Sequence, residues 1–92
     1  MAVVFIPAPL RRLTGGRSRV DVAAASAHQL VEGLEARFPG FRSYLLDESG
    51  VLKAYVNVFV NGTEVRALAG LRTPLGETDE VSIIPAMAGG AA

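Results

Sequence analysis

Only one segment of this sequence, residues 26–38, repeats its apolar side chains at the spacing of a helix. The repeat consists of Leu30, Val31, Leu34 and Phe38. Ser26 followed by Gln29 is a capping-box signature for the start of this helix, and Pro39-Gly40 ends the pattern. The other apolar runs are short and rich in β-branched residues, which is typical of strands. The chain must therefore bury one amphipathic helix against a sheet.

The first two strand-like runs, residues 3–6 and 18–23, predict a hairpin with a long connection. That connection contains Thr14-Gly15-Gly16, where glycine permits the positive φ angles of tight or bulged turns. A phosphate-binding loop is the alternative interpretation of Gly15-Gly16, which lies between arginines. The spacing fits neither nucleotide-binding fingerprint and no helix pattern begins there, so we interpret the segment as a turn.

A second hairpin is predicted where the period-2 strand Tyr55–Val60 meets the turn residues Asn61-Gly62 and a short strand over residues 64–66. Alternation assigns side chains of this strand and of the final strand to two faces of the sheet. The core face receives Val56, Val58, Val60, Val81 and Ile83, and the outer face receives Tyr55, Asn57, Phe59, Ser82 and Ile84. If the two strands are neighbours, Phe59 and Ile84 form an exposed apolar patch. Otherwise they are two unrelated surface residues.

The order of the elements is hairpin, helix, strand, short strand and final strand. This order predicts an α+β fold of the β-grasp type, with one main helix on one face of a mixed sheet of four to five strands. We expect one domain over residues 1–88 and a flexible tail over residues 89–92. Gly33 inside the helix predicts close packing on the sheet. Leu68, Leu71 and Leu75 are expected to pack a loop against the core.

Composition argues against several classes of function. Nine basic and nine acidic residues cancel, so we expect no nucleic-acid partner and no membrane surface. The chain has no cysteine and a single histidine, His28, which we interpret as a surface residue, so we expect no metal and no bound cofactor. No apolar run approaches the ~18 residues of a membrane span, and no leader pattern is visible. We therefore expect a cytoplasmic protein.

Gly89 and Gly90 stand two residues before the C-terminus, just after the final strand. Residues without a Cβ pass through narrow channels and adopt almost any backbone angle. The pair therefore suits a C-terminal carboxyl group that must enter another protein's active site. A frayed terminus of small residues is the alternative.

Three segments of the chain resemble the ThiS/MoaD family of ubiquitin-like sulfur carriers: residues 56–62, residues 79–86 and Gly89-Gly90. The long first hairpin, its Thr14-Gly15-Gly16 turn and the ending over residues 84–90 are most similar to the actinobacterial sulfur carriers of cysteine biosynthesis. The small subunit of molybdopterin synthase is the next nearest resemblance.

The resemblance implies a protein cosubstrate rather than an enzyme. An adenylating partner of the ubiquitin-activating type would use ATP to activate the carboxyl group of Gly90, which sulfur would then convert to a thiocarboxylate. The sulfur would pass to a pyridoxal-phosphate cysteine synthase. The alternatives are molybdopterin synthesis, in which the large subunit of molybdopterin synthase would accept the sulfur, and thiamine synthesis. Phe59, Ile84 and Met87 would dock on the partner.

Ala91 and Ala92 depart from this family pattern, since carriers ready for activation end in Gly-Gly. The resemblance implies cleavage between Gly90 and Ala91 by a zinc metalloprotease; an artificially added tail is the alternative. Two other functions stay open at this point. One is a protein tag joined through Gly90 to lysines of target proteins, with Lys53 as the only lysine of the carrier itself. The other is a non-reactive interaction module.

Overall fold

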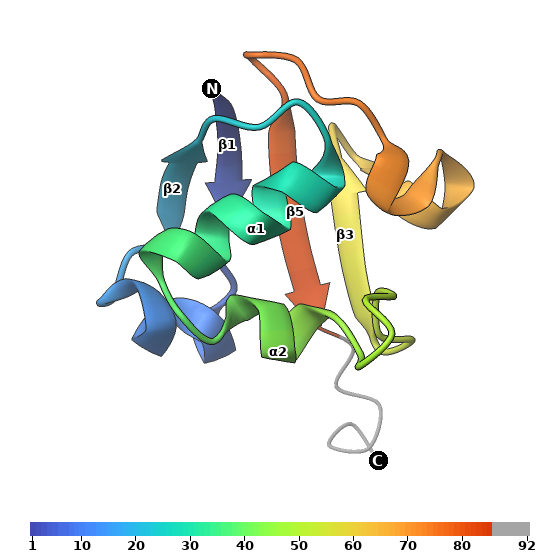
Figure 1. The fold of residues 1–92 in the computed structure, drawn as a ribbon. Coiled ribbons are helices and arrows are strands. Elements are labelled where there is room, and N and C mark those ends of the chain that lie inside the picture. The colour runs from blue at the N-terminus through green and yellow to red at the C-terminus, as the bar shows by residue number, and fades with distance from the viewer. Residues whose placement is uncertain (86–92) are drawn as a thin grey trace.

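The computed structural model describes residues 1–85 and contains a five-stranded mixed sheet in the order β2-β1-β5-β3-β4 (Figure 1). The strands are β1 (Ala2–Phe5), β2 (Arg19–Val22), β3 (Val56–Val60), β4 (Thr63–Glu64) and β5 (Glu80–Pro85). β1 and β5 are parallel, whereas the other neighbouring pairs are antiparallel. The main helix α1 (Ala27–Arg37) lies across one face of the sheet and is followed by the short helix α2 (Phe41–Leu45). The predicted β-grasp architecture is confirmed.

Helix α1 begins where the capping box predicts. The Ser26 hydroxyl oxygen accepts a hydrogen bond from the Gln29 amide at 3.2 Å, and the Gln29 side-chain oxygen accepts one from the Ala25 amide at 2.9 Å. The return bond therefore reaches one residue before the cap, but it still satisfies a free amide at the helix entry. Phe38 follows the last helical residue, so both predicted ends agree with the structure within one residue.

The core lies between α1 and the face of the sheet that α1 covers. All five side chains assigned to the core face of the last strand and of Tyr55–Val60 are buried: Val56, Val58, Val60, Val81 and Ile83. From the helical layer, Leu30, Val31, Leu34, Phe41 and Leu45 pack into the same cluster. Alternation along β3 and β5 is therefore confirmed, and it leaves their remaining side chains on the face that α1 does not cover.

The loops differ from the predictions in two places. Three 3-10 helices lie within residues 1–85: η1 (Ala8–Thr14), η2 (Val65–Ala67) and η3 (Gly70–Arg72). The predicted strand over residues 64–66 ends at Glu64, because the buried Val65 turns into the core and the Glu64 carboxylate accepts a hydrogen bond from the Arg66 amide at 3.1 Å. Leu68 is 48% exposed, so its predicted packing is wrong, although Leu75 is buried. None of the helices in residues 1–85 has the length and apolar character needed to cross a membrane.

Gly33 packs directly against strand β2, as its position in the helix predicts. A Cβ atom added at Gly33 would lie 2.8 Å from Cγ1 of Val22. Valine is stiff about χ1, so the contact cannot relax freely. We expect Gly33→Ala to lower the free energy of unfolding by about 1 kcal/mol, because overpacking outweighs the better helix propensity of alanine.

Urea denaturation checks this expectation. Val22 is itself buried, so Val22→Ala alone also lowers stability, but the double variant should lose less than the sum of the two single losses, because Val22→Ala removes the atom that the new methyl group meets. Ala36→Gly, at an exposed position of the same helix, measures the propensity term alone. A more stable Gly33→Ala variant would show that helix and strand are not in close contact.

Asp79 closes the turn that leads into β5. Its carboxylate accepts hydrogen bonds from the Gly76 amide at 2.8 Å and from the Asn61 side chain at 3.0 Å. Asn61 in turn accepts a hydrogen bond from the Glu80 amide at 2.9 Å. The bond from Gly76, followed by that from Asn61, lowers the pKa of Asp79 below its ordinary value of 3.8. The charged carboxylate therefore fixes the start of the strand that carries the tail.

We expect the contribution of Asp79 to stability to depend on pH. Because its pKa is lower in the folded chain than in the unfolded chain, the contribution is complete above 3.8 and is lost as the pH falls through the folded value. Asp79→Asn should be less stable than the parent near neutral pH, and the difference should shrink in acid. Thermal unfolding of the parent and of Asp79→Asn at a series of pH values measures this difference. Glu77→Gln, at an exposed neighbouring position, is the control. A difference that does not change with pH would contradict the role of the charge.

Candidate functional site

The chain leaves the described structure at the carboxyl end of β5, the middle strand of the sheet. Pro85 is the last residue of β5 and pairs in register with Val56, the first residue of β3. β1 pairs with the first half of β5, up to Ser82, and β3 pairs with β5 as far as Pro85, so the exit point is fixed by the centre of the sheet. The predicted site residues Met87, Gly89, Gly90 and Ala91, and the domain boundary at residue 88, lie outside the described residues.

Phe59 and Ile84 lie on adjacent strands and on the face of the sheet that α1 leaves uncovered. Phe59 pairs in register with Ser82, and Ile84 pairs with Asn57, so Phe59 and Ile84 are diagonal neighbours across β3 and β5. Ile84 is 49% exposed and Phe59 is half-buried. The first condition for the predicted patch, that the two strands are neighbours, is therefore met. The patch begins one residue before Pro85, beside the exit point.

Phe5 belongs to the same face, although the sequence analysis did not assign it. On β1 it pairs in register with Ser82, so Phe5 and Phe59 flank the same small residue of the central strand. Phe5 is 37% exposed, whereas its neighbours Val4 and Ile6 are buried. Alternation along β1 was the available signal, but it is hidden in a run in which every residue is apolar. We call Phe5, Phe59 and Ile84 the open-face patch.

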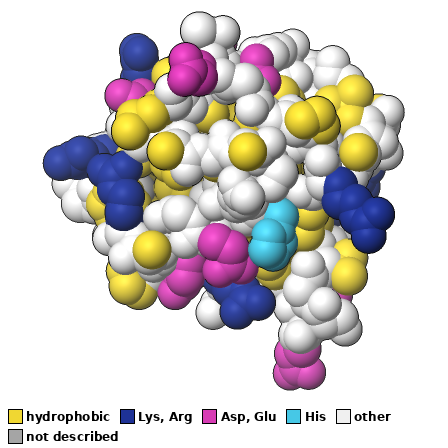
Figure 2. All heavy atoms as spheres, turned by 45° about the horizontal axis from the view of Figure 1, so that its top comes forward, with side chains coloured by type: hydrophobic (Ala, Val, Ile, Leu, Met, Phe, Trp, Pro, Cys, Tyr) yellow, Lys and Arg dark blue, Asp and Glu magenta, His cyan; other side chains and the backbone are white. Residues whose placement is uncertain are grey.

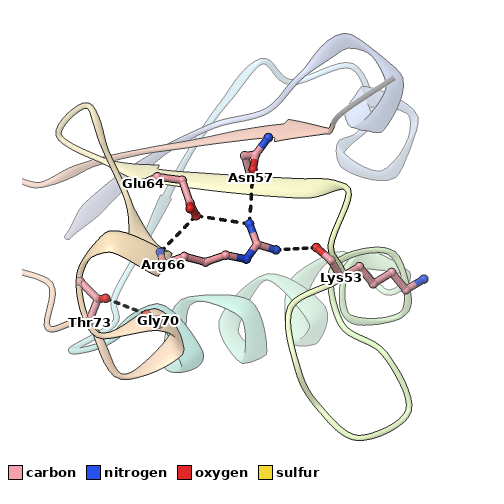
Figure 3. Close-up of polar contacts among 6 residues, drawn as sticks. All are labelled: Lys53, Asn57, Glu64, Arg66, Gly70 and Thr73. Atoms are coloured by element: carbon pink, nitrogen blue, oxygen red, sulfur yellow. Dashed lines mark hydrogen bonds and ion pairs between the residues drawn. The ribbon is translucent and has the colours of Figure 1, made fainter. Parts of the chain in front are cut away.

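Arg66 forms hydrogen bonds and an ion pair near the end of the sheet from which the chain leaves (Figure 3). Its guanidinium donates to the Lys53 carbonyl oxygen at 2.6 Å and to the Asn57 side-chain oxygen at 3.3 Å, and it forms an ion pair with Glu64 at 3.4 Å. Strand β4 pairs only with Phe59 and Val60. Arg66 therefore covers the part of β3 that β4 does not pair with, where β3 would otherwise be an open edge of the sheet. Lys53 and Asn57 lie 13 and 9 residues before Arg66, so no local pattern reveals these two contacts.

The only lysine, Lys53, is held close to the same end of the sheet. Its ammonium group donates to the Ser43 carbonyl oxygen at 2.7 Å and lies 5.9 Å from the centroid of the Tyr55 ring. The side chain is half-buried. Both contacts must be broken before the amine can attack an acyl group.

The single histidine and the acidic side chains do not form a metal site within residues 1–85. His28 lies at the surface, 3.6 Å from Glu32, and Arg42 is 3.3 Å from the same carboxylate. Figure 2 shows the histidine beside acidic and basic side chains, with apolar side chains scattered over that face of the molecule. Within residues 1–85, no three His, Asp or Glu side chains are grouped so that they could hold a metal ion.

Comparison with known proteins agrees with this geometry. The ThiS family profile matches residues 4–90. The chain is 39% identical over 89 residues to the sulfur carrier protein CysO of Mycobacterium tuberculosis, covering 95% of this chain and 96% of that protein. It is 40% identical over 86 residues to small archaeal modifier protein 3 of Haloferax volcanii, covering 90% and 91%. The fold is similar to a chain of the Amycolatopsis orientalis BexX/CysO complex, with a TM-score of 0.90, 32% identity and coverage of 94% and 96%.

Proposed function

The chain belongs to the ThiS family, and we propose that it is a sulfur carrier whose reactive group is the carboxyl group of Gly90, freed by removal of Ala91 and Ala92. The observation that carries the proposal is the position of Pro85 at the end of the central strand, with Gly89-Gly90 following shortly after it. The chain is then a cosubstrate and not a catalyst. Residues 86–90 can span at most about 17 Å when extended, so the folded body must dock at the entrance of the partner's active site.

The chemistry begins with a carboxylate, which is a poor electrophile. In an adenylating partner, the Gly90 carboxylate attacks the α-phosphate of ATP, pyrophosphate leaves, and an acyl-adenylate forms. A sulfide or persulfide sulfur then attacks the acyl carbon and AMP leaves. After attack by a persulfide, a thiol attacks the outer sulfur of the acyl disulfide, a new disulfide forms, and the thiocarboxylate leaves. ATP belongs to the partner, and the carrier needs no cofactor of its own.

The partners follow from this sequence of reactions. We propose an adenylating enzyme of the ubiquitin-activating type and, as acceptor, a pyridoxal-phosphate cysteine synthase, which the relative named sulfur carrier protein CysO supports. The large subunit of molybdopterin synthase is the alternative acceptor. A zinc metalloprotease would cleave after Gly90. The structure of CysO with BexX supports a protein partner, and we propose that all of these steps occur in the cytoplasm.

The docking surface that we propose is the open-face patch together with Met87. The patch lies on the uncovered face of the sheet beside the exit of the tail, and it combines two aromatic side chains with Ile84. Aromatic and aliphatic side chains at the centre of an interface carry most of the binding energy in many complexes.

Intact mass spectrometry tests the proposed function. A chain ending at Gly90 is incubated with ATP, a sulfide source and the organism's own adenylating enzyme. We expect the mass increase that replacement of one oxygen by sulfur produces, and no increase when ATP is left out. A chain in which Gly90 is deleted is the matched control. An unchanged mass with every adenylating enzyme of the organism would refute the proposal.

A second candidate function is a protein tag, which the similarity to small archaeal modifier protein 3 favours. Both functions need the acyl-adenylate, but a tag transfers Gly90 to a lysine amine of a target. Blots against the carrier in cell extracts separate them, because a tag gives heavier species linked through lysine. A Lys53→Arg carrier that keeps those species shows that the acceptors are other proteins.

A further inference from the structure

Charge is unevenly distributed along the chain despite the neutral total. Residues 1–20 contain four arginines and no acidic residue: Arg11, Arg12, Arg17 and Arg19. All four are exposed, and none forms an ion pair within residues 1–85. Residues 73–80, which lead into β5, have the opposite character, with Glu77, Asp79 and Glu80 and no basic residue. We call the four arginines the arginine platform.

The platform is built on an ordered segment. Between β1 and β2 the chain folds as η1, which buries Leu10 and Thr14. The Thr14 hydroxyl group is 3.1 Å from the Arg11 carbonyl oxygen and 2.7 Å from that of Arg17, and the Gly16 amide donates to the Arg11 carbonyl oxygen at 2.8 Å. Gly15 has φ 67° and ends the helix. The arginines therefore extend from a fixed backbone, which lowers the entropy cost of binding.

The platform lies at the end of the sheet from which the tail leaves. β1 and β5 are parallel neighbours, so their carboxyl ends share one edge of the sheet. The segment with η1 follows β1 at that edge, as Figure 1 shows, and the tail follows β5. Arg19 also pairs in register with Phe5, so the platform adjoins the open-face patch. The acidic segment before β5 lies at the opposite end of the strand.

We propose that the arginine platform docks on a carboxylate-rich protein surface beside the active-site entrance of the adenylating partner. The inference rests on the proposed function, since it places the platform against the enzyme that activates the Gly90 carboxylate. Guanidinium groups bind carboxylates in a two-pronged geometry, and complementary charge accelerates association and fixes orientation. A protein surface fits better than nucleic acid, because the platform adjoins the apolar open-face patch, which a protein partner can cover and a phosphate backbone cannot.

The test removes charge from the platform while keeping its backbone. A chain ending at Gly90 carries Arg12→Gln, Arg17→Gln and Arg19→Gln; Arg11 is kept because its Nε donates to the Ile6 carbonyl oxygen at 3.1 Å. ATP–pyrophosphate exchange by the adenylating enzyme is measured against carrier concentration and salt. We expect KM to rise about tenfold at low salt with kcat unchanged, and the salt dependence of kcat/KM to flatten.

Two control variants make the result specific. Arg72→Gln changes an exposed arginine outside the platform and should leave KM and its salt dependence unchanged. Replacing the same three arginines by lysine should keep the salt dependence, because the charge is retained, while part of the affinity is lost. Unchanged melting temperatures show that the variants are folded.

Three results would overturn the inference. The glutamine variant could match the parent in KM and salt dependence. Alternatively, the parent but not the glutamine variant could retard duplex DNA or bind phosphatidylserine vesicles while exchange is unaffected, which would assign the platform to another class of partner. If the parent itself gives no exchange, the proposed function fails. The docking role of the platform is then tested separately, by measuring the dissociation constants of parent and glutamine variant for the same enzyme without ATP. Equal dissociation constants in that experiment would reject it.

Discussion

A chain ending at Gly90 should support ATP–pyrophosphate exchange at least about 10²-fold faster than the full 92-residue chain, because only the shorter chain presents its carboxylate at the reacting position. In the longer chain the Gly90 carbonyl is part of an amide, which cannot form an adenylate. Its free carboxylate belongs to Ala92 and is displaced by up to about 7 Å along the chain. A misplacement of 1 Å can already cost about 10²-fold in rate.

Exchange of labelled pyrophosphate into ATP, with the adenylating enzyme saturated with nucleotide, measures this difference. A chain ending at Ala91 is the matched control and should be as inactive as the full chain, because it too lacks a free Gly90 carboxylate. Addition of the organism's metalloprotease should restore exchange to the full chain. Equal exchange by all three chains would show that Gly90 is not the activated residue.

Local patterns predicted the parts of the fold in which neighbouring residues differ in character. β3 alternates between valine and more polar or exposed residues, so its buried face could be read directly, and the Ser26 cap marked the start of α1. Gly33 could be interpreted as a close contact because glycine is otherwise unfavourable inside a helix. In each case the residue type carried information about its own surroundings.

The parts that the sequence did not reveal depend on long-range contacts or on backbone geometry without periodicity. η1 has no amphipathic repeat, and one of its two buried anchors is Thr14, a polar residue that is satisfied by carbonyl oxygens on both sides. The network of Arg66 joins segments that pattern analysis treats separately. Phe5 was missed because both of its neighbours are apolar, so only the strand register shows which side chains face outward.

We expect removal of the open-face patch to have the second largest effect on activation. Phe59→Ser combined with Ile84→Ser should raise KM for the adenylating enzyme by about 10²-fold with little change in kcat, because two apolar anchors are lost while the tail is intact. Serine fits the surface, since Ser82 already lies beside Phe59 in register. The core contacts of both strands are unchanged because their buried side chains point to the other face.

Steady-state exchange at varied carrier concentration separates KM from kcat, and thermal unfolding confirms that the double variant is folded. Val51→Ser is the matched control, because Val51 is 57% exposed but lies outside the patch. It should leave both constants unchanged. If the double variant kept the KM of the parent, docking would have to use another surface near the tail. A fall in kcat at constant KM would instead show that the patch aligns the tail in the active site. Contacts that only hold the folded body on the enzyme contribute to binding, so their loss raises KM.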